Sequence, residues 1–129
     1  MKPESRLHLA SLILRVTSAL MLTHGWKKLS TFGDKMHTFA DPLHIGSTAS
    51  LALTVFAEFF CTLFIVTGLF TRIAVIPLII TFLVIVLIVH APDPFGEKEP
   101  ALLYLLIYTC ILITGSGKYS LDHLLRKKY

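Results

Sequence analysis

The chain has 129 residues, enough for one domain, and 54% of them are hydrophobic while only 16% are charged. This composition excludes a disordered chain and disfavours a soluble enzyme, because so short a chain cannot hide this much apolar surface from water. The mean hydropathy of +0.72 is typical of a small integral membrane protein, and the formal net charge of +4 is too modest to indicate nucleic-acid binding.

Four stretches approach the roughly 20 apolar residues that a helix needs to cross a bilayer. The fourth is short and would require a thinner bilayer or burial inside the bundle. We expect the first to be retained rather than cleaved as a signal peptide, because Arg15 interrupts it and no small-residue cleavage site follows. The pattern predicts an all-α fold, an integral membrane four-helix bundle, as a single domain over residues 1–129. The stretches are Leu7 to Leu29, Thr48 to Phe70, Ile73 to His90, and Pro100 to Gly115.

The connections between these stretches differ in length. Only Thr71 and Arg72 separate the second from the third, which predicts a tight antiparallel hairpin. The first connection, Ser30 to Ser47, is long and could lie in the membrane interface or dip back into the bundle. The third, Ala91 to Glu99, contains two prolines and cannot be helical throughout.

The end of the chain and the basic residues predict the orientation. From Tyr119 to Tyr129, three leucines share one helical face and basic residues follow, which predicts a short interfacial helix held by anionic lipid. Four crossings put both termini on one side, with seven basic residues against four on the other, so we expect both termini in the cytoplasm and the protein in the cell inner membrane. The seven are Lys2, Arg6, Arg72, Lys118, Arg126, Lys127 and Lys128; the four are Lys27, Lys28, Lys35 and Lys98.

Two charges lie inside the predicted spans, where an ionised side chain costs at least about 2.5–3.5 kcal/mol. Counting along each helix places Arg15 roughly 12 Å and Glu58 roughly 18 Å from the cytoplasmic end, a difference that an arginine side chain largely covers. Small and polar residues flank both charges at helical spacing, as in helix–helix interfaces in lipid. We therefore expect an Arg15–Glu58 pair in the bundle interior, either as a structural clamp or as part of a ligand or proton site.

Histidines gather toward the non-cytoplasmic side. His24 and His90 are expected at similar depth, where an imidazole could hydrogen-bond a quinone carbonyl or bind a metal or haem; polarity at the membrane interface would also explain them. No spacing among the histidines matches a metal-ligand signature, so we predict no metal site. His24 lies roughly 180° around its helix from Arg15, so the two are not expected to share a site unless the helix breaks near Gly25. The other two are His37 and His44.

Tyrosines and cysteines complete the candidate interior. Tyr104 and Tyr108 share a helical face, where they could form an aromatic belt or line a cavity with Glu58, and the deeper Tyr108 favours the cavity. Cys61 and Cys110 differ by roughly 6 Å in depth, which favours two buried free thiols over a disulfide.

Several short pieces follow one another in a characteristic order: Leu14-Arg15, His24-Gly25-Trp26-Lys27-Lys28-Leu29, Ala57-Glu58, Gly68-Leu69-Phe70-Thr71-Arg72, His90, and Gly115-Ser116-Gly117-Lys118-Tyr119-Ser120-Leu121-Asp122. Together they resemble the DoxX family of small bacterial membrane proteins. The resemblance implies a four-helix membrane bundle and carries over Arg15, His24, Lys28, Glu58, Arg72 and His90, without assigning any of them a catalytic role. Named members resemble a subunit of archaeal thiosulfate:quinone oxidoreductase, and relatives in animals look like membrane chaperones.

These features predict a ligand site and leave three functions to compare. Arg15, Glu58 and Tyr108 are the first candidates for ligand binding, His24 and His90 the next, and quinone is the cofactor considered. The first function is a quinone-linked subunit of a membrane redox complex, because no cofactor motif supports an autonomous oxidoreductase. The alternative is a non-enzymatic chaperone or assembly factor; a small-molecule or proton carrier ranks last, because no inverted repeat is visible. Expected partners are membrane lipid and either another protein or a second copy of the chain, and no nucleic acid.

Overall fold

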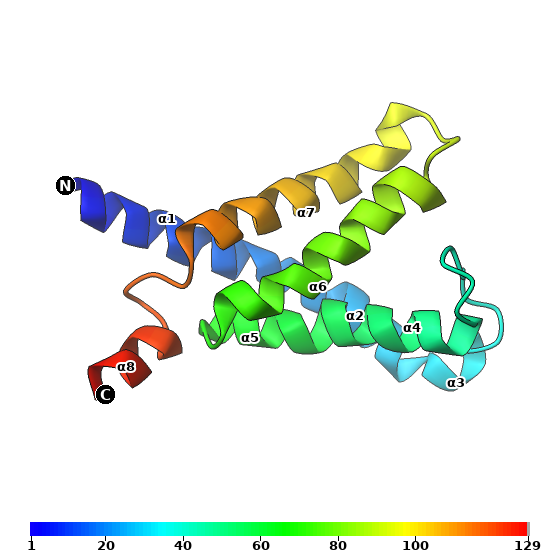
Figure 1. Cartoon of the computed structure of the whole chain (residues 1–129), viewed down its shortest axis with the longest axis horizontal. Coiled ribbons are helices and arrows are strands. Elements are labelled where there is room, and N and C mark those ends of the chain that lie inside the picture. Colours follow the sequence, from blue (N-terminus) through cyan, green and yellow to red (C-terminus); the bar gives the residue numbers. More distant parts are fainter. Residues whose placement is uncertain (129) are drawn as a thin grey trace.

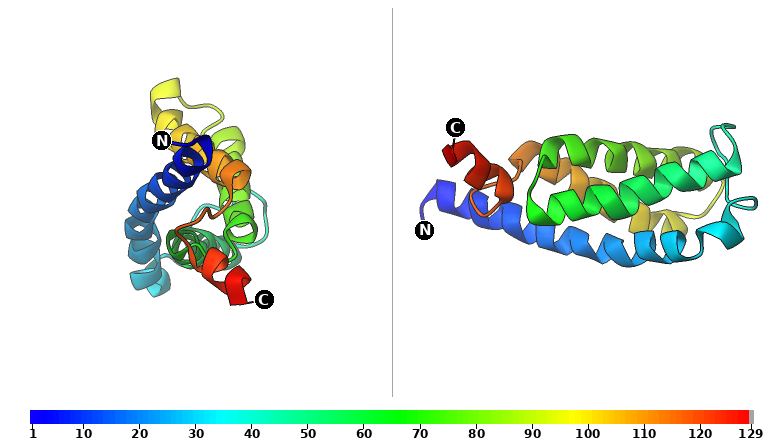
Figure 2. Two further views of the ribbon diagram at one scale, coloured as in Figure 1. Left: turned by 90° about the vertical axis from the view of Figure 1, so that its left-hand side faces the viewer. Right: turned by 90° about the horizontal axis from the view of Figure 1, so that it is seen from below.

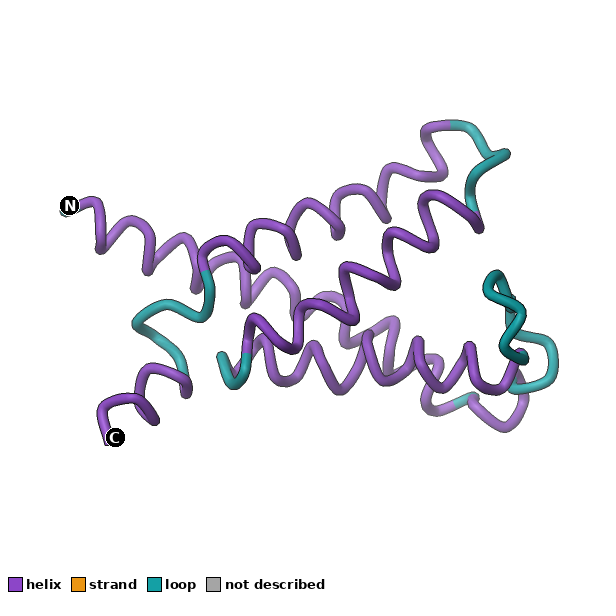
Figure 3. Tube along the Cα trace, viewed as in Figure 1, coloured by secondary structure: helices purple, strands orange, loops and turns teal. Residues whose placement is uncertain are grey.

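The computed structural model describes the backbone of residues 1–128, and the regular elements of that part of the chain are helices (Figures 1 and 3). Four long helical segments make up the bundle, and two short helices, α3 and α8, lie near its ends. The segments are α1 (Pro3–Thr17) with η1 (Ser18–Leu20) and α2 (Met21–Ser30); α4 (Ser47–Val55) with η2 (Phe56–Cys61) and α5 (Thr62–Thr67); α6 (Thr71–Val84) with η3 (Ile85–Val89); and α7 (Phe95–Thr114). The short helices are α3 (Phe32–Lys35) and α8 (Leu121–Lys128).

The first three segments are long and apolar enough to cross a membrane. Their outward faces carry exposed aliphatic side chains such as Leu53, Ile80 and Leu87, whereas Arg15 and Glu58 are buried inside. Charged groups inside and aliphatic side chains outside are the reverse of a soluble protein, and they suit a lipid solvent. The chain is therefore a multi-pass membrane protein.

The fourth segment is longer than the sequence predicted. Helix α7 begins at Phe95, five residues before the expected start at Pro100, and its 20 residues give a length of about 30 Å. Extended Pro94 precedes its first turn, where the acidic Glu97 favours a helix start. The expectation of a short fourth helix was thus wrong, because the helix begins before Pro100 and continues through it.

The predicted hairpin between the second and third segments is confirmed. Helix α5 ends at Gly68, whose φ of 77° is left-handed, and the Leu69 amide donates to the Phe64 carbonyl at 2.9 Å. Phe70 is also left-handed, with a φ of 49°, and α6 begins at the next residue. A left-handed glycine satisfies the free carbonyls at a helix end and reverses the chain within a few residues.

Both chain termini lie at the same end of the bundle, and α3 lies at the opposite end (Figure 2). Helices α6 and α7 run antiparallel and pack along each other (Figures 1 and 2). None of residues 31–46 is buried, so the long first connection covers one end of the bundle and does not dip into it. The shared apolar core includes Met21, Ile65, Leu78, Phe82 and Ile111.

Candidate functional site

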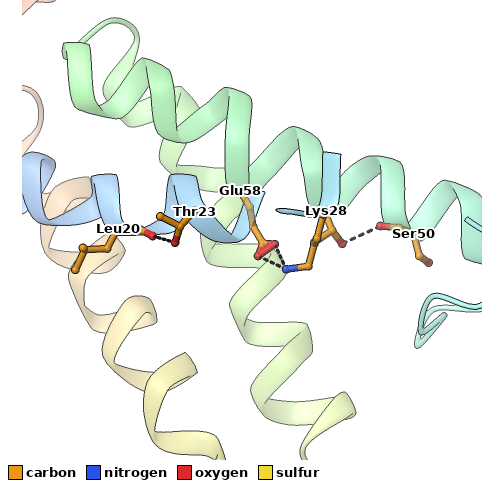
Figure 4. A network of polar contacts seen from close by, with 6 residues as sticks. Leu20, Thr23, Lys28, Ser50 and Glu58 are labelled. Atoms are coloured by element: carbon orange, nitrogen blue, oxygen red, sulfur yellow. Dashed lines mark hydrogen bonds and ion pairs between the residues drawn. The ribbon is translucent and has the colours of Figure 1, made fainter. Parts of the chain in front are cut away.

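A buried carboxylate lies in the middle of the second segment. Glu58 is 3% exposed and belongs to the π-helical turn η2, which interrupts the regular helix between α4 and α5. The Lys28 ammonium, from α2, lies 2.8 Å from each of the two Glu58 carboxylate oxygens (Figure 4). The Lys28 side chain is 25% exposed, so the pair is buried at the carboxylate and reaches the surface at the ammonium. π-helical turns in α-helices often occur at functional sites.

A glycine explains how the two elements come this close. A Cβ atom added at Gly25 would lie 2.7 Å from the Phe59 amide nitrogen and 2.9 Å from the Glu58 carbonyl oxygen. Helix α2 and the π-helical turn therefore touch backbone to backbone, as small residues allow in membrane helix packing. Gly25 and Lys28 are three residues apart on one face of α2, so the same face brings Lys28 to the carboxylate.

The predicted Arg15–Glu58 pair is wrong. Arg15 is 1% exposed, and its guanidinium donates to the carbonyls of Val66 (3.1 Å), Ile65 and Tyr119. Arg15 thus meets α5 at Ile65 and Val66, the first of which is seven residues after Glu58. Seven residues are about 10 Å along a helix, whereas the predicted depths of Arg15 and Glu58 differ by roughly 6 Å. Two of these carbonyls, those of Ile65 and Val66, belong to the C-terminal end of α5, where the helix dipole attracts a cation.

Three aromatic rings pack against one another in the core of the bundle. The rings of Phe82, Tyr104 and Tyr108 are mutually 5.6–6.1 Å apart, and the His24 ring meets the Tyr104 ring edge-on at 6.3 Å. Tyr108 is fully buried, and among the described residues its hydroxyl has no hydrogen-bond partner. This cluster brings together His24 and Tyr108 from the predicted set, both through Tyr104.

His90 lies apart from this group, at the start of the loop before α7. Its Nδ1 atom is 2.7 Å from an Asp93 carboxylate oxygen, and Glu97 offers a third ligand atom, all three atoms lying within 4.8 Å of one another. The three residues could hold a metal ion, an arrangement that no spacing among the histidines indicated. Because His90 faces Asp93 whereas His24 faces Tyr104, the structure does not bring the two predicted histidines together.

A lipid-facing groove of about 340 Å³ reaches one edge of the aromatic group. It lies between η1 and the first half of α7, and Tyr104 lines both the groove and the aromatic cluster. Glu58 does not line it, so this groove is distinct from the cavity predicted beside Glu58. The other lining residues are Thr17, Leu20, Gly96, Glu99, Pro100, Leu103 and Ile107.

A comparison with known protein families shows which family the chain matches. The DoxX family matches residues 10–91, which is more than half of the chain. The chain belongs to the DoxX family. No curated protein and no solved structure matches it.

Most of the DoxX pieces quoted above lie in two places in the structure, and His90 lies apart from both. Gly25, Lys28 and Glu58 form the ion-paired contact, whereas Arg15 and Gly68 meet the segment after α7 at the termini end. That last segment, Gly115 to Asp122, lies outside the matched residues. Lys28 entered the predictions only in the count of basic residues and as a piece of the resemblance. Its helical spacing from Gly25 was the signal that could have placed it beside Glu58.

Proposed function

We propose that this DoxX protein is a quinone-binding subunit of a membrane redox complex, with the quinone ring in the groove at Tyr104. The observation that carries the proposal is that Tyr104 lines the groove and stacks on Tyr108, which is fully buried inside the bundle. A quinone needs donors for its carbonyls and an aromatic surface for its ring, and Tyr104 supplies both a hydroxyl donor and a ring. Its tail would stay in lipid, because the groove is on the outside of the bundle.

The electrons in this proposal come from a partner protein. Reduction of a quinone to a quinol takes two electrons and two protons, and this chain has no recognised electron-carrying motif. Its own part is to hold the quinone ring against Tyr104 in the groove. We further propose that α7 is the fourth crossing, that the chain lies in the inner membrane, and that both termini face the cytoplasm.

Quinone affinity of the purified protein in nanodiscs tests the proposal. A short-chain ubiquinone should bind the wild type, and Tyr104→Phe should weaken binding three- to tenfold, the cost of about one hydrogen bond. Glu58→Gln should also weaken binding, because it removes the charge that positions Lys28. Tyr119→Phe is the matched control, since that tyrosine is 52% exposed and does not line the groove. Equal affinity in all four proteins would contradict the proposed site.

One observation favours the second candidate, a non-enzymatic assembly factor. Glu58 lines neither described cavity, and its carboxylate already has Lys28 as a partner, so the pair could serve only to fix the helices. Absence of quinone binding to the wild type at concentrations found in membranes would favour this function. A second membrane protein recovered after crosslinking in intact membranes would then identify what it assembles.

A further inference from the structure

A large cavity lies at the termini end of the bundle and shares no lining residue with the proposed quinone groove. Its volume is about 870 Å³, and it lies among the start of α6, the end of α7, α8 and one residue of α1. The ends of membrane-crossing helices lie at the depth of lipid headgroups, so the cavity opens where phosphates are abundant. It plays no part in the proposed function. The lining residues that matter here are His8, Thr71, Arg72, Asp122, His123 and Arg126.

Arg72 is held in place at this cavity by the backbone of α7. Its Nε atom donates to the Leu112 carbonyl at 3.2 Å, and Nη2 donates to the Ile113 carbonyl at 3.3 Å. Gly115 leaves room for this arrangement, because a Cβ atom there would lie 3.2 Å from the guanidinium. The guanidinium is thus preorganised, and its Nη1 group stays available to donate to an anion.

His8 presents a second donor. Its Nδ1 atom accepts the Lys118 backbone amide at 3.0 Å, so a neutral imidazole carries its proton on Nε2. That N–H remains available to a ligand in the cavity. Thr71 also lines the cavity; it is 1% exposed, and its hydroxyl has no hydrogen-bond partner within residues 1–128.

Among the residues that the structure describes, Asp122 is the one acidic residue that lines the cavity, and it repels a bound anion only weakly. The Asp122 carboxylate accepts the Phe70 amide at 2.8 Å and the Thr71 amide at 3.3 Å, so its oxygens are directed at the start of α6. With Arg72 and Arg126 both charged, the lining has a net positive charge even when both histidines are neutral. Arg126 is exposed and free to move toward a ligand.

Apolar side chains surround the same opening. Phe70, Ile73 and Leu125 line it and are 57%, 70% and 39% exposed. A free phosphate has no use for such a rim, whereas the acyl chains of a lipid do. We propose that this cavity binds the phosphate of an anionic phospholipid, with Arg72, Arg126 and His8 as donors and the acyl chains along Ile73 and Phe70.

Lipid retention measured by native mass spectrometry tests the proposal. The protein is exchanged into detergent with equal amounts of phosphatidylglycerol and phosphatidylcholine. The wild type should retain phosphatidylglycerol preferentially, and Arg126→Gln should reduce its affinity about fivefold, the effect of one basic residue near a membrane surface. Arg72→Gln should do the same, and Lys27→Gln, an exposed lysine near the opposite end, should leave the affinity unchanged.

The other outcomes overturn the proposal. Equal retention of the two lipids, or no loss in Arg126→Gln, would show that the cavity does not select anionic headgroups. Inorganic phosphate or glycerol 3-phosphate added at millimolar concentration distinguishes the two sources of phosphate. Displacement of phosphatidylglycerol by either compound would mean that the cavity binds free phosphate and not a lipid. If Arg72→Gln fails to fold, Arg126→Gln decides the question alone.

Discussion

Glu58 depends on a single cation. Both of its carboxylate oxygens lie 2.8 Å from the Lys28 ammonium, and the Glu58 side chain is only 4% exposed. Removing one member of a buried pair leaves the other charge unpaired, which costs about 3–5 kcal/mol in general. The 25% exposure of Lys28 brings the expected cost to the lower end, because water can reach the ammonium.

Lys28→Ala should therefore lower the free energy of unfolding by about 3 kcal/mol. The double substitution Lys28→Ala with Glu58→Gln should cost less than the sum of the two single ones, because the unpaired carboxylate is gone. Unfolding by denaturing detergent measures all three. Lys27→Ala is the control, since that neighbouring lysine is exposed and should change stability little. Strict additivity would contradict a direct pair.

Gly25→Ala should destabilise the protein even though alanine normally favours a helix by about 1 kcal/mol over glycine. The added Cβ would meet the backbone of Phe59 at 2.7 Å, and backbone atoms of two packed helices cannot move aside cheaply. Gly33→Ala is the matched control, because nothing lies within 4 Å of a Cβ at that position. A melting temperature for Gly25→Ala at or above that of the wild type would refute the backbone contact.

At the residue scale, the sequence predicts that each buried charge needs a partner but not which partner. The depth of each charge was counted from a predicted helix start, which carries an error of several residues. That error is enough to pair Arg15 with Glu58, although its actual partner on that segment is Val66. Arg15 donates to backbone carbonyls. Every helix end has free carbonyls, so no sequence pattern identifies the ones that Arg15 binds. The stacking of Tyr104 on Tyr108 was predictable, because it depends only on their spacing of four residues along one helix.

At the scale of elements, the segment after α7 fastens the end of the bundle. Asp122 accepts both amides at the start of α6, its own amide donates to the Gly68 carbonyl at 3.0 Å, and Ser11 donates to the Gly115 carbonyl at 2.7 Å. A Cβ atom at Gly68 would lie 2.4 Å from the Ser120 Cβ. The hairpin, α1 and the final segment are therefore joined by polar contacts between distant parts of the chain.

Asp41 organises the loop at the other end. Partial desolvation opposes ionisation of its carboxyl, but hydrogen bonds from Ser50, Gly46 and Ile45 outweigh it, and the pKa lies below its usual value. A lowered folded-state pKa means that the loop contacts are stabilising above the unfolded pKa of about 3.9. They are lost as the pH falls through the folded-state pKa.

The amide shifts of Ile45 and Gly46, followed by NMR in detergent, should titrate together with a midpoint below about 3.9. Asp41→Asn should abolish this titration, because the amide side chain does not ionise. A midpoint at or above 3.9 in the wild type would contradict the hydrogen-bonded carboxylate.

The helices themselves were largely predictable, and their ends less so. Hydropathy located the second segment within three residues at each end, and the glycine at position 68 indicated the hairpin. The start of α7 was missed because hydropathy begins at Pro100, whereas helix capping acts through Pro94 and Glu97. The π-helical turn at Glu58 had no sequence signal, since such turns depend on packing against α2.

At the scale of the whole molecule, the termini lie at one end of a bundle with a lipid-facing exterior (Figure 2). The excess of basic residues at that end predicts that it faces the cytoplasm. In intact cells, an impermeant thiol reagent should label Lys35→Cys, and it should label Lys2→Cys only after permeabilisation. Labelling of Lys2→Cys in intact cells would reverse the orientation.

The central claim is that a quinone binds in the groove at Tyr104, and photolabelling with an azido-quinone in native membranes tests it most directly. We predict label in peptides covering residues 17–20 and 99–107, suppressed by excess unmodified quinone, weaker in Tyr104→Phe and unchanged in Tyr119→Phe. Label spread evenly over the lipid-facing helices, and unaffected by excess quinone, would contradict the claim.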